Sequence, residues 1–184
     1  MFPPVKIISP RFEIREFGPQ DAAAVAAFVA AGDRTALPPG SPDTLADVDR
    51  WLAETLPRRR SSGDGLHLAI VERSTGTIVG SIGLRDTDWA TGRTEIGYGT
   101  HTSQRGRGCA TEAARAVGQW ALTDGGMRRV QLHSRLDNMA SLRVAEKAGY
   151  QREGTLPVAE KDGREAHDLA IYSMTSTGTT APQP

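Results

Sequence analysis

The chain has 184 residues, enough for one domain with a substantial core and short for two. Its 22 lysines and arginines balance 22 aspartates and glutamates, so the formal net charge is zero, which disfavours a protein that binds nucleic acid through bulk positive charge. A single cysteine, Cys109, excludes an intramolecular disulfide, and no apolar run suits a signal peptide or a membrane span. We therefore expect a cytoplasmic domain that binds neither nucleic acid nor a membrane.

The first third of the chain combines one strand with two helices. After a short lead-in at residues 1–10, residues 11–17 alternate apolar and polar side chains as a strand does. A helix starts at residues 18–21, where proline is tolerated in the first turn, and a second helix is expected over residues 42–58. We interpret the basic run at 58–60 as a solvated helix end, because cations are stabilised at a helix C-terminus.

The rest of the chain consists mainly of strand patterns. Strands are expected at residues 66–72, 77–84, 93–101, 128–134, 150–154 and 165–174. Helices interrupt them at residues 108–123 and 138–149. This order predicts a mixed α/β fold in a single domain over residues 11–175, followed by a disordered tail at 176–184 that is rich in Ser, Thr, Gly and Pro.

The most informative stretch is Gln-Arg-Gly-Arg-Gly-Cys-Ala-Thr-Glu-Ala at residues 104–113, between an expected strand and an expected helix. Glycines at such a turn let the backbone approach a ligand, and the free N–H groups of the helix start favour an anion. No Gly-Lys-Ser/Thr follows Gly108, which excludes a Walker loop, and Thr111 stands where a dinucleotide fingerprint needs glycine. The stretch therefore predicts a different kind of pyrophosphate cradle.

The order Arg105-x-x-Gly108-x-Ala110 resembles the acetyl-coenzyme A signature of the GNAT N-acetyltransferases. The Ala-Thr-Glu-Ala continuation, and the string from Asn138 to Gly154, resemble the RimJ/RimL-like branch, which acetylates the N-termini of ribosomal proteins. The resemblance covers nearly the whole domain. It implies the GNAT fold, a mostly antiparallel twisted sheet with a V-shaped splay between strands 4 and 5 and flanking helices. It also implies acetyl-coenzyme A (acetyl-CoA) as co-substrate.

The resemblance implies a set of cofactor-binding residues. The strand segment would pair with the pantetheine amides, the loop would bind the pyrophosphate through its N–H groups, and Asn138 would contact the pantetheine arm. The full set is Tyr98, Gly99, Thr100, His101, Arg105, Gly106, Arg107, Gly108, Cys109, Ala110, Thr111, Asn138, Ser141 and Lys147.

Three residues are candidates for proton transfer by the same resemblance. Ser141 would lie near the thioester sulfur and give the leaving thiolate its proton, and Glu160 would deprotonate the incoming ammonium. Glu95, on the strand before the loop, competes for the role of base. Purely structural explanations also stay open for three of the candidate site residues. Asn138 would be a helix N-cap, Ser141 would be a first-turn hydroxyl that bonds the backbone, and Glu160 would be a solvated surface residue.

Cysteine and histidine offer weaker signals. A helix N-terminus would lower the pKa of Cys109, but a small side chain in the loop explains this residue without a thiol nucleophile. The four histidines have no metal-ligand spacing, so no metal site is expected, and His133 and His167 are candidates to line the acceptor cleft. Trp51 and Trp89 would either wall that cleft or pack in the core or on a loop.

These patterns predict an N-acetyltransferase in which a primary amine attacks acetyl-CoA directly, with a protein or peptide N-terminus as the expected acceptor. A small-molecule amine (an antibiotic or a polyamine), a non-catalytic acyl-CoA sensor and a nucleotide-binding protein are the alternatives. A homodimer is left open. One departure concerns the acceptor side, because Gly99 stands where the family usually has a bulky residue.

Overall fold

The computed structural model describes residues 1–162 and 165–176, and the side chains of these residues other than 158–162 and 165. The strands are β1 (Lys6–Ile8), β2 (Phe12–Glu16), β3 (Gly65–Glu72), β4 (Ile78–Asp88), β5 (Arg93–Thr100), β6 (Arg129–Arg135), β7 (Gln151–Asp162) and β8 (Glu165–Thr175). The helices are α1 (Ala22–Ala30), α2 (Val48–Arg50), α3 (Leu56–Ser62), α4 (Cys109–Thr123) and α5 (Met139–Ala148), with short helical turns η1 (Pro19–Asp21), η2 (Arg34–Ala36), η3 (Leu45–Asp47), η4 (Trp51–Thr55) and η5 (Thr102–Gln104). The predicted tail reaches beyond the described residues.

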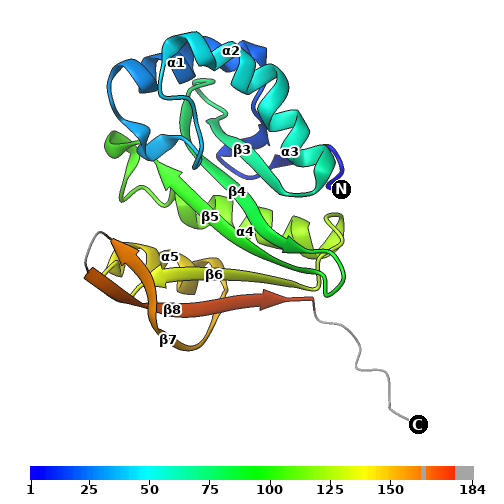
Figure 1. Ribbon diagram of the computed structural model, residues 1–184, viewed down its shortest axis with the longest axis vertical. Helices are drawn as coiled ribbons and strands as arrows, with labels where there is room; N and C mark the ends of the chain where they lie inside the picture. The colour runs from blue at the N-terminus through cyan, green and yellow to red at the C-terminus, as the bar shows by residue number, and fades with distance from the viewer. Residues whose placement is uncertain (163–164, 177–184) are drawn as a thin grey trace.

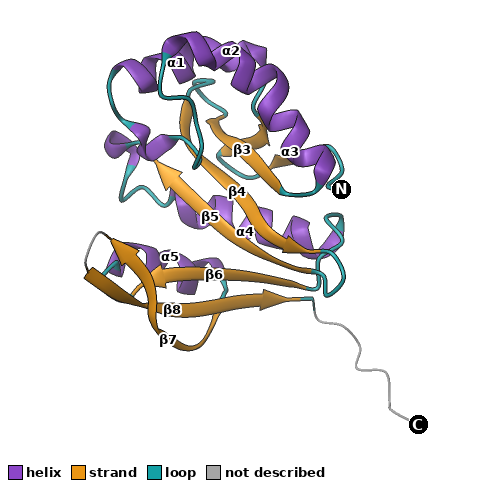
Figure 2. Cartoon of the chain, viewed as in Figure 1, coloured by secondary structure: helices purple, strands orange, loops and turns teal. Residues whose placement is uncertain are grey.

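All eight strands form one sheet in the order β1-β2-β3-β4-β5-β6-β8-β7, and every neighbouring pair is antiparallel except β5 and β6. The parallel pair β5–β6 is in register at three positions only, from Arg93↔Arg129 to Glu95↔Gln131. Beyond Glu95 the two strands diverge, which splits the sheet into two wings (Figures 1 and 2). Apart from the additional short β1, this is the mixed α/β fold that the element order predicted, with the V-shaped splay that the resemblance implied.

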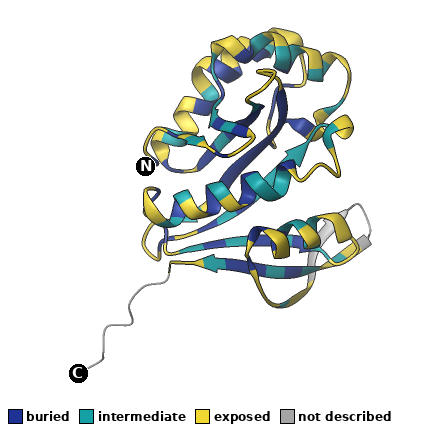
Figure 3. Cartoon of the chain, turned by 180° about the vertical axis from the view of Figure 1, so that it is seen from behind, coloured by how far each residue is buried: buried dark blue, intermediate teal, exposed yellow. Residues whose placement is uncertain are grey.

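Helices cover both faces of the sheet, because alternate residues of a strand point to opposite sides. On β3, Leu68 and Ile70 belong to the core that packs under α4 and α5, whereas Ala69 and Val71 belong to a second core under α1 to α3. Figure 3 shows α4 and α5 lying across one face with their inner residues buried. Ala113, Ala114, Val117 and Ala121 form the inner stripe of α4 and are completely buried, and Trp120 on the same helix is partly buried against them.

The predicted lead-in belongs to the folded domain. It contains β1, and the Phe2 side chain is completely buried. The Phe2 ring lies 4.7 Å from Trp89 and 6.4 Å from Trp120, measured between ring centroids. Trp51 is buried beside Phe17 in the second core. Trp51 therefore packs in the core, and Trp89, 41% exposed, packs on a turn against Phe2; neither lines a cavity described below.

Two elements differ from their predicted form. The helix expected over residues 42–58 is a succession of short pieces from η3 to α3, with a π-helical segment at Trp51–Thr55, and it ends at Gly63 in the left-handed conformation (φ +84°). The β7 strand is much longer than the predicted 150–154, because after Gly154 the chain continues to pair with β8 past a register shift between Leu156 and Glu160. Neither a π-bulge nor a register shift leaves a periodic signal in the sequence.

Candidate active site

Two cavities meet where the sheet splays. The loop cavity, about 660 Å³, lies between the 104–111 loop, the end of β5 and the start of α5. The large cavity, about 950 Å³, lies between β4, β5 and β6 and is walled by the segment 34–41. The two cavities share five lining residues: Thr35, Tyr98, Gly99, Asn138 and Ser141. The splay is what permits this junction, because β5 beyond Glu95 has no strand partner on the β6 side.

The loop cavity gathers most of the predicted cofactor residues. Those that line it are Tyr98, Gly99, Thr100, Arg105, Gly106, Gly108, Cys109, Ala110, Thr111, Asn138, Ser141 and Lys147. Arg143 also lines it and was missed, because a lone arginine on a helix is indistinguishable in sequence from a solvated one. The two predicted residues outside the lining have other partners: Arg107 Nη1 donates to Gln104 Oε1, and His101 Nε2 lies 3.2 Å from Asp33 Oδ2.

The backbone of the loop is held in a conformation that favours glycine. Gly106 and Gly108 have φ values of +75° and +77°, in the left-handed region that side chains rarely adopt. Gly108 is the N-cap of α4, and the first intrahelical bond runs from the Glu112 N–H to the Gly108 carbonyl at 3.1 Å. The N–H groups before Glu112 therefore have no partner within the helix, and they lie along the loop cavity. Together with Arg105, Arg143 and Lys147, they fit a pyrophosphate.

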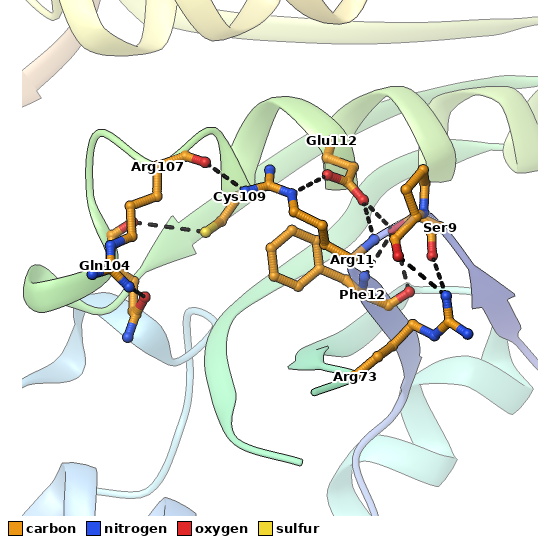
Figure 4. Close-up of polar contacts among 9 residues, drawn as sticks. Ser9, Arg11, Phe12, Arg73, Gln104, Arg107, Cys109 and Glu112 are labelled. Atoms are coloured by element: carbon orange, nitrogen blue, oxygen red, sulfur yellow. Dashed lines mark hydrogen bonds and ion pairs between the residues drawn. The ribbon is translucent and has the colours of Figure 1, made fainter. Parts of the chain in front are cut away.

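A polar clamp fixes the start of α4 to the start of β2 (Figure 4). The Glu112 carboxylate accepts hydrogen bonds from Ser9 Oγ at 2.7 Å, from the Arg11 N–H at 2.9 Å and from Arg11 Nε at 2.7 Å. Arg11 Nη1 also donates to the Arg107 carbonyl at 2.8 Å. Partial burial raises the pKa of Glu112, but these hydrogen bonds outweigh it and the pKa is lowered. The glutamate of the Ala-Thr-Glu-Ala string thus holds the loop in place.

A pair of hydroxyl groups lies at the junction of the cavities. The Tyr98 hydroxyl is 2.8 Å from Ser141 Oγ and 3.3 Å from the Ser141 carbonyl. Burial raises the pKa of Tyr98 to about 12, so its hydroxyl is protonated at neutral pH and can donate. Asn138 caps α5 by accepting the Ser141 N–H at 3.1 Å, which is the structural role left open for it. Tyr98 was predicted to bind the cofactor only; its contact with Ser141 joins segments 43 residues apart and is not visible in sequence.

Glu95 lies in the large cavity at the point where β5 and β6 separate. Its carboxylate pairs with Arg85 through Oε1 and accepts a hydrogen bond from His133 Nδ1 at 2.9 Å through Oε2. Burial raises the pKa of Glu95, but the hydrogen bonds from His133 and Arg85 and the charge of Arg85 outweigh it, so the pKa is lowered. Of the two histidines predicted to line the acceptor cleft, His133 lines this cavity and His167 is not among its lining residues. A carboxylate with a lowered pKa is a weaker base, which counts against Glu95 in that role.

Glu160 lies in β7, opposite His167 of β8, in a segment that the sequence suggested was a loop. Its side chain is outside the described residues, so its role as base stays a prediction. The register places the pair on the C-terminal wing, whose residues Leu156 and Leu169 line the large cavity.

The segment before α2 explains why Gly99 replaces a bulky residue. A Cβ atom built on Gly99 would lie 2.1 Å from the Thr35 carbonyl oxygen, so only glycine admits this approach. Thr35 Oγ1 also donates to the Thr100 carbonyl at 3.3 Å. The segment 34–41 therefore packs directly on β5 and closes one side of the large cavity.

The basic run at 58–60 is not simply a solvated helix end. Arg59 lines the large cavity and donates to His67 Nε2 at 3.1 Å, and Arg60 pairs with Glu16 at 3.0 Å. Burial, followed by the charges of Arg59 and Arg85, lowers the pKa of His67 to about 4, so His67 is neutral at pH 7. The contact between Arg59 and His67 links α3 to β3, and no local sequence pattern predicts it.

The expectation that the helix N-terminus lowers the pKa of Cys109 is wrong. Burial raises the pKa of its thiol and outweighs the nearby cations Arg11 and Arg107. The side chain is buried, with Sγ 3.7 Å from the Gln104 carbonyl oxygen, which fits its interpretation as a small packing residue in the loop. Among the described residues, no three His, Cys, Asp or Glu side chains are grouped so as to hold a metal ion.

No helix within the described part of the chain has the length and apolar character needed to cross a bilayer.

The family model of the acetyltransferase (GNAT) domain matches residues 11–151, and the chain belongs to this family. The N-acetyltransferase p20 of Bacillus licheniformis, itself uncharacterized, is 26% identical over 112 residues, which cover 61% of this chain and 63% of p20. Matches to the curated relatives span between 48% and 63% of the relatives' own lengths.

Solved structures share the fold over almost the whole chain. Mycobacterium smegmatis RimJ, in complex with a coenzyme A disulfide, has a TM-score of 0.80 at 21% identity and covers 96% of this chain and 90% of its own. RimL, the ribosomal L7/L12 α-N-protein acetyltransferase, was solved with coenzyme A and has a TM-score of 0.78 at 19% identity, covering 93% and 98%. At these identities the likeness defines the fold and not the substrate.

Proposed function

We propose that the protein is an acetyl-CoA-dependent N-acetyltransferase that acetylates a primary amine, and that the acceptor is a protein or peptide N-terminus. The observation that carries the proposal is the junction of two cavities at Tyr98 and Ser141. One cavity has the N–H groups and cations that suit a pyrophosphate, and the other is large enough for a separate acceptor. The buried free thiol of Cys109 fits a cytoplasmic location.

Acetyl-CoA supplies an acetyl thioester, whose carbonyl carbon forms a C–N bond with the amine while the C–S bond breaks. The backbone N–H groups at the start of α4 hold the pyrophosphate, and the edge of β5 from Ile96 to Gly99, which has no strand partner on the β6 side, offers hydrogen-bonding groups to an amide-bearing arm. Tyr98 and Ser141 then stand beside the junction, where the paired hydroxyls supply the proton that the departing thiolate takes up.

The amine must lose a proton during the reaction. A free α-amino group has a pKa of about 8, so modest assistance from a carboxylate suffices at neutral pH. Glu95 is engaged by Arg85 and His133, which favours Glu160 as the base within our proposal. His133, whose Nδ1 bonds Glu95 and which also lines the large cavity, is a further candidate.

The test is a panel of amine acceptors in which free-thiol release from acetyl-CoA is measured, together with a calorimetric titration of the protein with acetyl-CoA. We expect binding in the titration and thiol release with peptide N-termini. Binding without thiol release for any amine would identify the sensor alternative. No binding at millimolar acetyl-CoA would refute the proposal.

A further inference from the structure

The wall of the large cavity carries an excess of positive charge. Its charged lining residues among those described are Arg34, Arg59, Arg85, Arg135 and Glu95. The formal net charge of the whole chain is zero, so the four arginines in the wall of this cavity are a local concentration of cations.

Three of these arginines have carboxylate partners. Arg34 Nη1 lies 2.9 Å from Asp43, Arg85 pairs with Glu95, and Arg135 Nη2 lies 2.8 Å from Asp137. Arg59 has no acidic partner among the residues that the structure describes. Its side-chain hydrogen bond goes to His67 Nε2, at 3.1 Å.

His67 positions the Arg59 guanidinium without neutralising it. Because Arg59 donates to Nε2, the proton of the neutral imidazole is on Nδ1. A neutral ring leaves the full charge of Arg59 available, and a guanidinium presents further N–H donors in a fixed fork that suits a carboxylate.

The floor between Arg59 and the reaction centre is nearly free of side chains. His67 of β3 pairs with Gly83 of β4, which pairs with Gly97 of β5. Ser81 and Gly99 form the next pair, and both line the cavity. Two strand spacings separate His67 from Gly97, which is roughly 10 Å. An extended peptide spans about 3.3–3.6 Å per residue, so a carboxylate on its second or third residue reaches Arg59 when the amine lies beside β5.

We propose that the acceptor carries a carboxylate near its amine, and that Arg59 binds it; an acidic residue at position two or three of the acceptor peptide meets this requirement. This proposal rests on the proposed function. The uncompensated charge of Arg59 also disfavours polyamines and other polycationic acceptors, and it favours the neutral form of the attacking amine over the ammonium.

The test compares four peptides that differ only at the second residue, with Glu, Gln, Ala or Lys there, in kcat/KM for thiol release. We expect the Glu peptide to exceed the Gln peptide by about tenfold or more, as a charge-assisted hydrogen bond implies, and the Lys peptide to be the poorest. In Arg59→Gln the preference for Glu over Gln should disappear, and Arg59→Lys should retain part of it. Arg58→Gln is the matched control, since Arg58 is adjacent and exposed like Arg59 but is not part of the cavity lining.

Thiol release without a preference for Glu, or an equal loss in Arg58→Gln and Arg59→Gln, would overturn the proposal while leaving the transferase function intact. Absence of thiol release with any amine would instead refute the transferase function. In that case the carboxylate site is tested by titrating the protein with the Glu and Gln peptides. Tighter binding of the Glu peptide, abolished in Arg59→Gln, would support the site, and equal binding of the two peptides would refute it.

Discussion

The loop cavity and the large cavity are built in different ways. The loop cavity is formed mostly by two short stretches of sequence, 98–111 and 138–147, each with its own local signals. The large cavity is assembled from many pieces that are far apart in the chain: the segment 34–41, α3, β3, β4, β5, β6, the start of α5, and β7 and β8. A site for a molecule shared by a whole family can be encoded in a motif, whereas a site for a particular acceptor is made from side chains that meet only in the fold.

The largest effect is expected from a substitution that disrupts the loop cavity and leaves the large cavity unchanged. Gly108→Val places a branched side chain at φ +77° beside the α4 N–H groups, and we expect acetyl-CoA affinity to fall by 100-fold or more. Calorimetry measures the affinity. The control is Gly76→Val, which carries similar strain (φ +71°) in the β3–β4 turn with nothing within 4 Å. Unchanged affinity in a folded Gly108→Val variant would show that the loop is not the cofactor site.

The junction is tested by removing its hydroxyl groups. Ser141→Ala and Tyr98→Phe should each lower kcat by about 10²-fold, since in our proposal this hydroxyl pair donates the proton and each variant removes one member of it, while acetyl-CoA affinity changes little. If both variants lose affinity and keep kcat, the two hydroxyls bind the cofactor and do not transfer a proton.

The base is tested by a comparison of carboxylates across pH. Glu160→Gln should reduce kcat/KM by about 10²-fold, most severely at low pH, where the amine is mostly protonated and deprotonation limits the rate. Glu95→Gln should cost less, because the pairing with Arg85 and His133 already lowers the pKa of Glu95. The reverse order would assign the base to β5, and near-normal rates in both would assign deprotonation to solvent.

A smaller effect is expected from the clamp. Glu112→Gln weakens the hydrogen bonds to Arg11 and Ser9, so we expect a loss of a few degrees in Tm and a few-fold loss in acetyl-CoA affinity. Because the folded-state pKa of Glu112 is lowered, its stabilisation is complete above the ordinary carboxylate pKa and is lost as pH falls through the lowered value. The Tm difference from wild type should therefore vanish in acid, and a pH-independent difference would contradict the clamp.

Much of the fold and of the loop cavity was predictable because their signals are local. Strand alternation, the helical stripe of α4, the N-cap at Asn138 and the glycines of the loop all act over a few residues. The extension of β7, the approach of Thr35 to Gly99 and the contact of Arg59 with His67 were not predictable, because each depends on tertiary packing between distant segments. The direction of the Cys109 pKa shift failed for the same reason, since burial outweighs the helix terminus.

The most direct test is a crystal structure of the protein with coenzyme A. We predict that the pyrophosphate lies against the N–H groups between Gly106 and Thr111, and that the sulfur lies beside the Tyr98 and Ser141 hydroxyls with the large cavity free for an acceptor. Coenzyme A bound away from the 104–111 loop, or with its sulfur remote from Tyr98, would contradict the assignment of the two cavities.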